Sequence, residues 1–358
     1  MASSTDVKSA RPLDPAVAAA AAELTIPSYI ISADGHACEP DSLWKELPAD
    51  IQANMPVIHR GAKRPEGGTI PKLRLEDMDK DGIAAEVLYP DTGLNLFRAE
   101  PDVQDAAFRL YNDWLADYCR TDPKRLFGIA AIAIYDVGAA IRELQRSHDL
   151  GLYGALIWGV PHPDLPFSSA HYDKFWSAAA ELGAPVNLHV LTGFNYSQYR
   201  TDDATQRIRE QTNVKMNETN DVLFDFVWSG IFDRHPKLKL VIVECEIGWL
   251  PFVLQQWDYY FTRNGNARPD QNDYNISRAP SDICREHVFA TFMDDVVGSR
   301  ALSYWGENNC MWSSDYPHGN MTFPHSRAFA ARQVGDLPRE SQERLLSKNV
   351  IELYGLKV

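Results

Sequence analysis

Eight short runs of β-branched and apolar residues alternate along this chain with longer amphipathic segments, and this alternation constrains the fold more than any other feature. The runs cover 28–33, 83–89, 126–134, 153–158, 185–190, 238–244, 287–292 and 309–314. Apolar residues at helical spacing predict helices over 100–120, 136–149, 170–182, 215–234, 248–263 and 338–354. Repeated units of this kind build a parallel sheet, and eight of them describe a closed (β/α)8 TIM barrel better than an open sheet.

The length of the chain fits one such barrel with additions. With 358 residues, 45% of them hydrophobic, the chain can bury one large core. We expect a single domain over 26–358, preceded by an alanine-rich arm over 1–25. Two polar or proline-rich stretches, 41–72 after the first strand and 264–286 before the seventh, predict long loops, which in compact domains are commonly lids or binding walls.

Charge and cysteine content exclude several classes of function. The formal charge of -14, from 49 acidic and 35 basic residues, repels nucleic acid and anionic membrane surfaces. No apolar run reaches the roughly 18 residues of a membrane-spanning helix. Five cysteines without CxxC spacing indicate reduced thiols and a cytoplasmic protein. The sequence does not decide whether the protein forms homo-oligomers or hetero-oligomers.

Side chains that can bind metal stand at the ends of four predicted strands. Asp34 and His36 end the first strand, His189 the fifth, Glu244 the sixth and Asp315 the eighth. The C-terminal ends of barrel strands form the rim where active sites are built. Each residue also has a structural reading, as a turn or capping residue or a core histidine. Three carboxylates and two imidazoles converging on one rim nevertheless predict a metal enzyme.

Other residues are weaker candidates for the same site. Glu39 and His318 could be further metal ligands, or could cap the chain and orient the ligands. His162, in the loop after the fourth strand, could reach a substrate. Three aromatic residues could line an apolar substrate pocket, although such residues more often belong to a core. They are Trp158, Phe194 and Trp249.

Four motifs resemble those of one known family. They are Asp34-x-His36-x-x-Glu39-Pro40, Val186-Asn-Leu-His189, Leu238-Lys-Leu-Val-Ile-Val-Glu244-x-x-x-Gly248-Trp249-Leu-Pro251 and Ser314-Asp315-Tyr-Pro-His318. The chain resembles the amidohydrolase-related family that includes aminocarboxymuconate semialdehyde decarboxylase, and the likeness extends over roughly 28–354. It implies a barrel with metal at its C-terminal mouth. Carried over by position, the ligands are Asp34, His36, His189 and Asp315.

Two positions depart from the decarboxylases of this family. Asp34 stands where they often have His or Glu, and Glu244 stands where they have a histidine used in acid/base work. A carboxyl of pKa about 4.3 differs chemically from a base with a pKa near 7. Members with glutamate at this position resemble a small branch of dinuclear non-heme iron or iron/manganese oxygenases.

The favoured expectation is therefore a monooxygenase that hydroxylates a small organic substrate with dioxygen. It would use two divalent metals, with iron preferred and manganese or zinc as alternatives. Asp34, His36 and Asp315 would bind one metal, and His189 with Glu39 or His318 the other. Glu244 would bridge the two or bind the second, and Glu244 and Asp315 are the candidate catalytic residues.

Two other functions fit the same residues. One is metal-dependent hydrolysis or decarboxylation of a small organic acid, with Glu244 or Asp315 as general base. The other is a catalytically silent subunit whose metal is structural. Two iron or manganese ions per chain would favour the oxygenase, one zinc with an open position the hydrolase or decarboxylase, and a closed zinc site the silent subunit.

Overall fold

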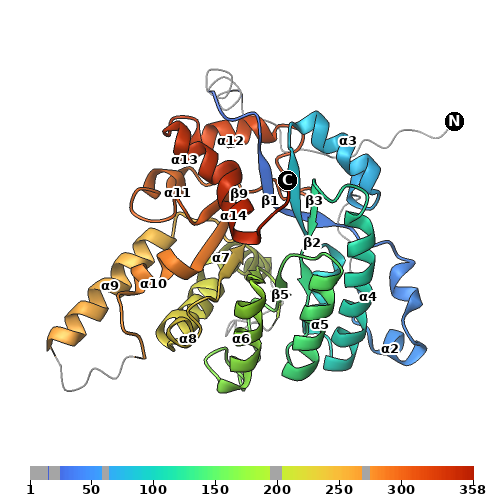
Figure 1. Ribbon diagram of the computed structural model, residues 1–358, viewed down its shortest axis with the longest axis horizontal. Helices are drawn as coiled ribbons and strands as arrows, with labels where there is room; N and C mark the ends of the chain where they lie inside the picture. Colours follow the sequence, from blue (N-terminus) through green and yellow to red (C-terminus); the bar gives the residue numbers. More distant parts are fainter. Residues whose placement is uncertain (1–14, 16–24, 59–63, 194–203, 268–274) are drawn as a thin grey trace.

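The structure is a computed structural model that describes residues 15, 25–58, 64–193, 204–267 and 275–358. It has the α/β barrel architecture predicted from the sequence, with helices arranged around a central set of parallel strands (Figure 1). The strands are β1 Ile31–Ala37, β2 Ala85–Pro90, β3 Leu126–Gly128, β4 Ala130–Ala131, β5 Ala155–Ile157, β6 Val186–His189, β7 Leu240–Val243, β8 Val288–Phe292 and β9 Cys310–Trp312. Nearly all of the expected arm, 1–25, lies outside the described residues.

All strand pairs are parallel, and they form two sheets with the orders β1-β2-β3 and β4-β5-β6-β7-β8-β9. β3 and β4 are successive parts of one barrel strand, separated by Ile129. On the other side, the first and last strands are joined by backbone hydrogen bonds from Asp315 N to Asp34 O (3.0 Å) and from His36 N to Tyr316 O (2.7 Å). These contacts complete a barrel of eight strands.

Helices cover the six predicted segments, and further helices lie outside them. They are α3 Pro71–Asp81, α4 Pro101–Cys119, α5 Val137–Asp149, α6 Asp173–Leu182, α7 Ala204–Trp228, α8 Ile231–Arg234, α9 Leu250–Ala267, α10 Pro280–His287, α11 Val296–Ala301, α12 Ser326–Val334, α13 Arg339–Glu343 and α14 Asn349–Tyr354. Four of these, α3, α10, α11 and α12, lie outside the predicted segments. Proline occupies the first turn of α3, α4 and α10, where its missing N–H leaves no bond unmade. Gly82 and Gly183 end α3 and α6 in the left-handed conformation that glycine allows.

Both stretches predicted to be long loops contain more helix than expected. The segment 41–72 includes two 3-10 turns, η1 Leu43–Glu46 and η2 Glu66–Gly68, and the short helix α2 Ala49–Asn54. The segment 264–286 is shortened at both ends, because α9 continues to Ala267 and α10 begins at Pro280. The prolines that indicated loops instead precede or begin short helices.

The barrel strands and the inner faces of the helices form one continuous apolar core. It contains several fully buried aromatic residues, with Trp158, Trp176 and Trp312 the largest. The five cysteines all lie in the described ranges, where they are buried and no disulfide joins them. Within the same ranges, no helix combines the length and apolar character needed to cross a bilayer.

Candidate metal centre

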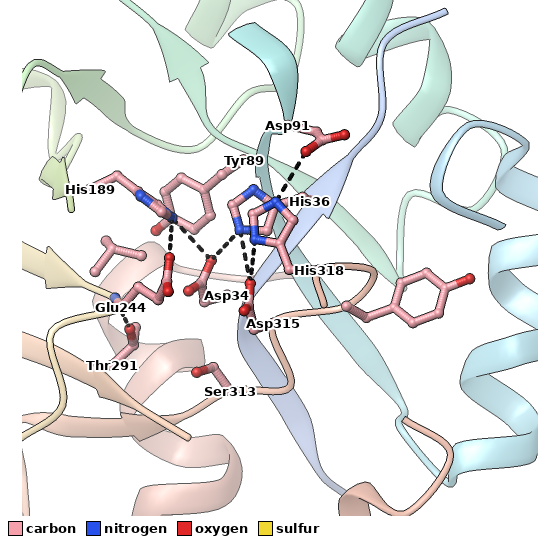
Figure 2. A network of polar contacts seen from close by, with 12 residues as sticks. Asp34, His36, Tyr89, Asp91, His189, Glu244, Thr291, Ser313, Asp315 and His318 are labelled. Carbon is pink, nitrogen blue, oxygen red and sulfur yellow. Dashed lines mark hydrogen bonds and ion pairs between the residues drawn. The ribbon is translucent and has the colours of Figure 1, made fainter. Parts of the chain in front are cut away.

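The candidate ligands come from four strands of the barrel, at or just beyond their C-terminal parts (Figure 2). Asp34 and His36 lie two residues apart on β1, so their side chains share a face of the strand. His189 ends β6. Glu244 directly follows β7, and Asp315 lies three residues beyond β9. Strand-end position is thus what brings residues distant in sequence to one place.

The candidate ligands form two groups, and within each group the ligand atoms lie within 4.8 Å of one another. His36 belongs to both groups. One group contains Asp34, His36 and His189; the other contains His36, Glu244, Asp315 and His318. Nε2 of His36 lies 3.2 Å from Asp315 Oδ1 and 3.6 Å from Asp34 Oδ1. Nε2 of His189 lies 3.8 Å from Asp34 Oδ1 and 3.7 Å from Glu244 Oε2. Carboxylate and imidazole donors this close together can surround a divalent cation.

Hydrogen bonds to backbone carbonyls orient both histidines. Nδ1 of His36 lies 2.7 Å from the carbonyl of Pro90, and Nδ1 of His189 lies 2.9 Å from that of Val190. These bonds place the proton on Nδ1 and leave the Nε2 lone pair for a metal. Both Nε2 atoms are buried and make no hydrogen bond to any described residue. The donor set therefore fits a bound metal ion.

The electrostatic surroundings keep both imidazoles neutral. Burial, and to a smaller extent the neighbouring His36, lower the pKa of His189 to about 3. Burial and nearby His318 also lower the pKa of His36, against the opposing effect of Asp315. A neutral imidazole is the form that binds metal.

Two of the candidate residues have unusual backbone conformations. Glu244 (φ 60°) and Asp315 (φ 53°) adopt the left-handed region, as do Glu246 and Leu191. Such conformations are uncommon outside glycine and cluster at functional sites, where the surrounding structure maintains them. They turn the chain sharply after β7 and β9, and the side chains of Glu244 and Asp315 point toward His189 and His36 (Figure 2).

His318 is held between two carboxylates. Its Nδ1 lies 2.8 Å from Asp315 Oδ1, its Nε2 lies 3.1 Å from Asp91 Oδ1, and its ring stacks on that of His36 with centroids 3.7 Å apart. Burial opposes its charge, but Asp315 and Asp91 outweigh this effect and raise the pKa of His318 to about 10. Burial would raise the pKa of Asp315, yet His318 and His36 hold it well below its usual range. His318 thus bridges Asp315 and Asp91, and both carboxylates favour its charged form.

Two residues of this region did not emerge from the sequence. Asp91 directly follows β2, so the strand-end pattern that marked the other acids could have identified it. Arg74, on α3, is fully buried and donates from Nε to Glu86 Oε2 (2.6 Å) and from one NH group to the carbonyl of His36 (2.7 Å). A second NH group donates to the carbonyl of Tyr316 at 3.3 Å. No spacing of charges in the sequence indicates this arrangement.

Glu39 lies outside both groups of ligand atoms. Its carboxylate accepts hydrogen bonds from the amide and hydroxyl of Thr92 (2.9 and 2.8 Å) and from the amide of Gly93 (3.1 Å). Burial raises the pKa of Glu39 to about 7, with Asp91 as the second cause. These contacts fasten the chain after β1 to the chain after β2.

The predicted substrate-binding residues lie in different surroundings. Trp158 is fully buried and packs on Tyr135, with ring centroids 4.5 Å apart. Trp249 donates from Nε1 to the carbonyl of Cys245 at 3.0 Å. The side chain of His162 is 42% exposed on its loop, and Phe194 lies outside the described residues. Substrate contact by these residues stays a prediction.

Comparison with known proteins identifies relatives along most of the chain. The family model described as Amidohydrolase matches residues 34–356. Gamma-resorcylate decarboxylase of Rhizobium sp. (strain MTP-10005) is 27% identical over 298 residues, covering 80% of this chain and 88% of that protein. The 2-amino-3-carboxymuconate-6-semialdehyde decarboxylase of Dictyostelium discoideum is 26% identical over 297 residues, covering 80% of this chain and 77% of that protein.

Solved structures share the fold. A 2,6-dihydroxybenzoate decarboxylase complexed with 2,6-dihydroxybenzoate superposes with a TM-score of 0.69 at 22% identity, covering 92% of this chain and 99% of the other. The 5-carboxyvanillate decarboxylase of Novosphingobium aromaticivorans DSM 12444 was solved in complex with manganese and 4-hydroxy-3-methoxy-5-nitrobenzoic acid. It superposes with a TM-score of 0.70 at 17% sequence identity, covering 92% of this chain and 96% of the other.

These relatives overturn the favoured expectation from the sequence. The expectation of a dinuclear iron monooxygenase using dioxygen is wrong, because the similar curated proteins are decarboxylases. The preference for iron also lacks support, since related decarboxylase structures contain manganese. The physical reason for the error is that a carboxylate-rich ligand set suits any hard divalent ion, so the number of carboxylates does not select for oxygen chemistry. The alternative, a metal-dependent decarboxylase of an organic acid, agrees better with these relatives.

Proposed function

Since the chain belongs to the amidohydrolase family, we propose that it is a divalent-metal-dependent decarboxylase that removes the carboxyl group of an aromatic acid without an oxidant. Four gamma-resorcylate decarboxylases, 27–28% identical to this chain, support the reaction and the substrate class. The observation that carries the proposal is the buried, neutral pair of His36 and His189, whose Nε2 atoms face carboxylates at the barrel mouth.

We assign four residues to a single cation. Asp34, His36, His189 and Asp315 would hold it, and manganese suits their mixture of carboxylate and imidazole donors. When bound, such an ion supplies Lewis-acid chemistry, which polarises substrate oxygens and offsets their negative charge. Arg74 supports this set by fixing the carbonyl of His36, itself a ligand, and the carbonyl of Tyr316, which follows the ligand Asp315.

The reaction needs a proton at one ring carbon. Protonation of the carbon that bears the carboxylate, followed by cleavage of the carbon–carbon bond, releases carbon dioxide and leaves hydrogen in its place. The bonding electrons return to the ring, so no oxidant or reductant takes part. A residue beside the metal ligands must therefore deliver a proton.

We assign this proton transfer to Glu244. Its side chain is 14% exposed, so it is accessible from the barrel mouth, and its Oε2 lies 3.7 Å from Nε2 of His189. His318 is less suited, because both of its ring nitrogens already face carboxylates. Glu244 Oε2 would deliver the proton and recover another from solvent. A carboxylic acid would thus do the work that the family resemblance assigns to histidine in the related decarboxylases.

Anaerobic turnover tests the proposal. Manganese-loaded protein would be incubated with 2,6-dihydroxybenzoate, 5-carboxyvanillate and a panel of other ortho-hydroxybenzoates. We expect equal amounts of carbon dioxide and the decarboxylated phenol from at least one acid, at a rate unaffected by oxygen. Glu244→Gln should lower turnover by about 100-fold or more, the usual effect of losing a general acid, while retaining manganese. His148→Ala, on the surface of α5, should change neither. Absence of carbon dioxide from every aromatic acid would refute the proposal.

A further inference from the structure

We propose that Asp295, in the loop after β8, is a positioning residue that sets the place of Glu244 by clamping the turn formed by residues 244–248. The inference rests on the proposed role of Glu244 in proton transfer. Asp295 belongs to none of the groups of potential metal ligands among the described residues, so it acts through the turn rather than on the metal.

The carboxylate of Asp295 joins two segments through three hydrogen bonds. Its Oδ2 accepts from the backbone amides of Ile247 (2.8 Å) and Gly248 (2.5 Å), at the end of the turn. Its Oδ1 accepts from the amide of Gly298 (2.7 Å), in the first turn of α11. The last bond is an ordinary helix cap, whereas the first two have no part in capping and connect the loop after β8 to the loop after β7.

Two further contacts from the same side hold the rest of the turn. The amide of Glu244 donates to Thr291 Oγ1 on β8 at 2.8 Å, a contact drawn in Figure 2. The amide of Met293 donates to Glu246 Oε2 at 3.1 Å. The segment 291–298 therefore fixes the turn at its beginning, middle and end.

The turn requires such support because of its backbone conformation. Glu244 (φ 60°) and Glu246 (φ 55°) are both non-glycine residues in the left-handed region, within three residues of each other. Conformations of this kind persist only when the surrounding structure imposes them. Without the clamp, we expect the turn to relax toward more common angles, which would move the carboxylate of Glu244 away from His189.

Two glycines show how closely the segments approach. A Cβ atom on Gly248 would lie 2.9 Å and 3.1 Å from the two carboxylate oxygens of Asp295. A Cβ atom on Gly298 would lie 2.8 Å from Asp295 Oδ2 and 2.9 Å from Gly248 N. Both backbones reach the carboxylate only because neither residue has a side chain.

Replacement of Asp295 by alanine tests the clamp, with the adjacent Asp294→Ala as matched control. The carboxylate of Asp294 bonds to Arg332 (3.2 Å) and Gln333 (2.8 Å) on α12. We expect Asp295→Ala to lower kcat about 10- to 100-fold, the usual effect of losing a residue that orients a ligand or catalytic group, with KM and manganese content nearly unchanged. Hydrogen exchange of the amides in 244–248 should become faster in Asp295→Ala alone.

A double-mutant cycle separates positioning from general damage. In a Glu244→Gln background, Asp295→Ala should lower the residual rate by less than about 2-fold, because the residue that it positions is already inactive. An equal loss in both backgrounds, or unchanged exchange in 244–248, would overturn the proposal. If Asp295→Ala does not fold, Asp295→Asn keeps one acceptor oxygen and should give an intermediate kcat and exchange rate. If the wild-type protein decarboxylates no aromatic acid, the proposed function is wrong. Hydrogen exchange in 244–248 still tests the clamp by Asp295 in that case.

Discussion

The amide nitrogen of Asp315 donates a 3.0 Å hydrogen bond to the carbonyl oxygen of Asp34, and this bond links the first and last strands of the barrel. Both residues also carry candidate metal ligands. Closure of the barrel and assembly of the metal centre are therefore one structural event, and the unfolded chain contains no comparable site. A metal that binds only the closed barrel must stabilise it.

Metal removal should lower the stability of the wild-type protein. At a manganese concentration 100 times its Kd, binding to the folded state alone adds about 2.7 kcal/mol to the free energy of unfolding. We expect denaturation in manganese and in chelator to differ by roughly this amount. In His189→Ala and Asp315→Asn, which each lack a proposed ligand, the difference should largely disappear. His148→Ala should behave as wild type; equal stabilisation of all four proteins would remove His189 and Asp315 from the ligand set.

Arg74 should be essential for the stability of the barrel. In Arg74→Met, the buried carboxylate of Glu86 loses its ion-pair partner, and the carbonyls of His36 and Tyr316 lose their bonds from Arg74. Breaking a buried ion pair in this way costs about 3 to 5 kcal/mol, to be measured by chemical denaturation. The double variant Arg74→Met/Glu86→Leu should recover part of the loss. Arg120→Met, which removes an exposed pair with Asp117, should have little effect.

Apolar runs predict where β6, β7 and β9 end, and with them the positions of His189, Glu244 and Asp315. β1 continues beyond its predicted end at residue 33 to Ala37, so that Asp34 and His36 lie on the strand itself. Arg74 and Glu86 were not predictable, because their pairing depends on how α3 packs over β1 and β2. The left-handed angles of Glu244, Glu246 and Asp315 have no sequence signal, since only glycine favours them intrinsically. The ligand residues predict a divalent metal but not the reaction, because the same carboxylates and imidazoles bind metal in enzymes of different reaction classes.

Gly35 should tolerate no side chain between the two ligands of β1. A Cβ atom there would lie 2.8 Å from the guanidinium of Arg74 and 3.3 Å from the carbonyl of Tyr316. In Gly35→Ala, the guanidinium group of Arg74 that donates to the carbonyl of Tyr316 must move. We expect manganese affinity to fall about 10-fold or more, measured by calorimetry. Gly319→Ala offers the matched control, because a Cβ atom there meets nothing within 4 Å. Equal affinities in the two variants would show that the close packing around Gly35 is unimportant for the metal.

Asp81 should make the protein less stable as pH rises from 4 to 7. Its buried carboxylate accepts bonds from the amide (2.9 Å) and hydroxyl of Ser326, but burial outweighs these bonds and raises the pKa of Asp81 to about 6. The folded state therefore binds this proton more tightly than the unfolded chain, whose aspartate has a pKa of about 3.9. The resulting stabilisation is complete below pH 4 and is lost as pH passes 6, a change of about 2 to 3 kcal/mol.

Asp81→Asn cannot titrate, so its free energy of unfolding relative to wild type should rise by that amount across this range. Asp79→Asn, on the exposed side of the same helix, should leave the pH profile unchanged, and parallel profiles for wild type and Asp81→Asn would show that Asp81 is already ionised at pH 4.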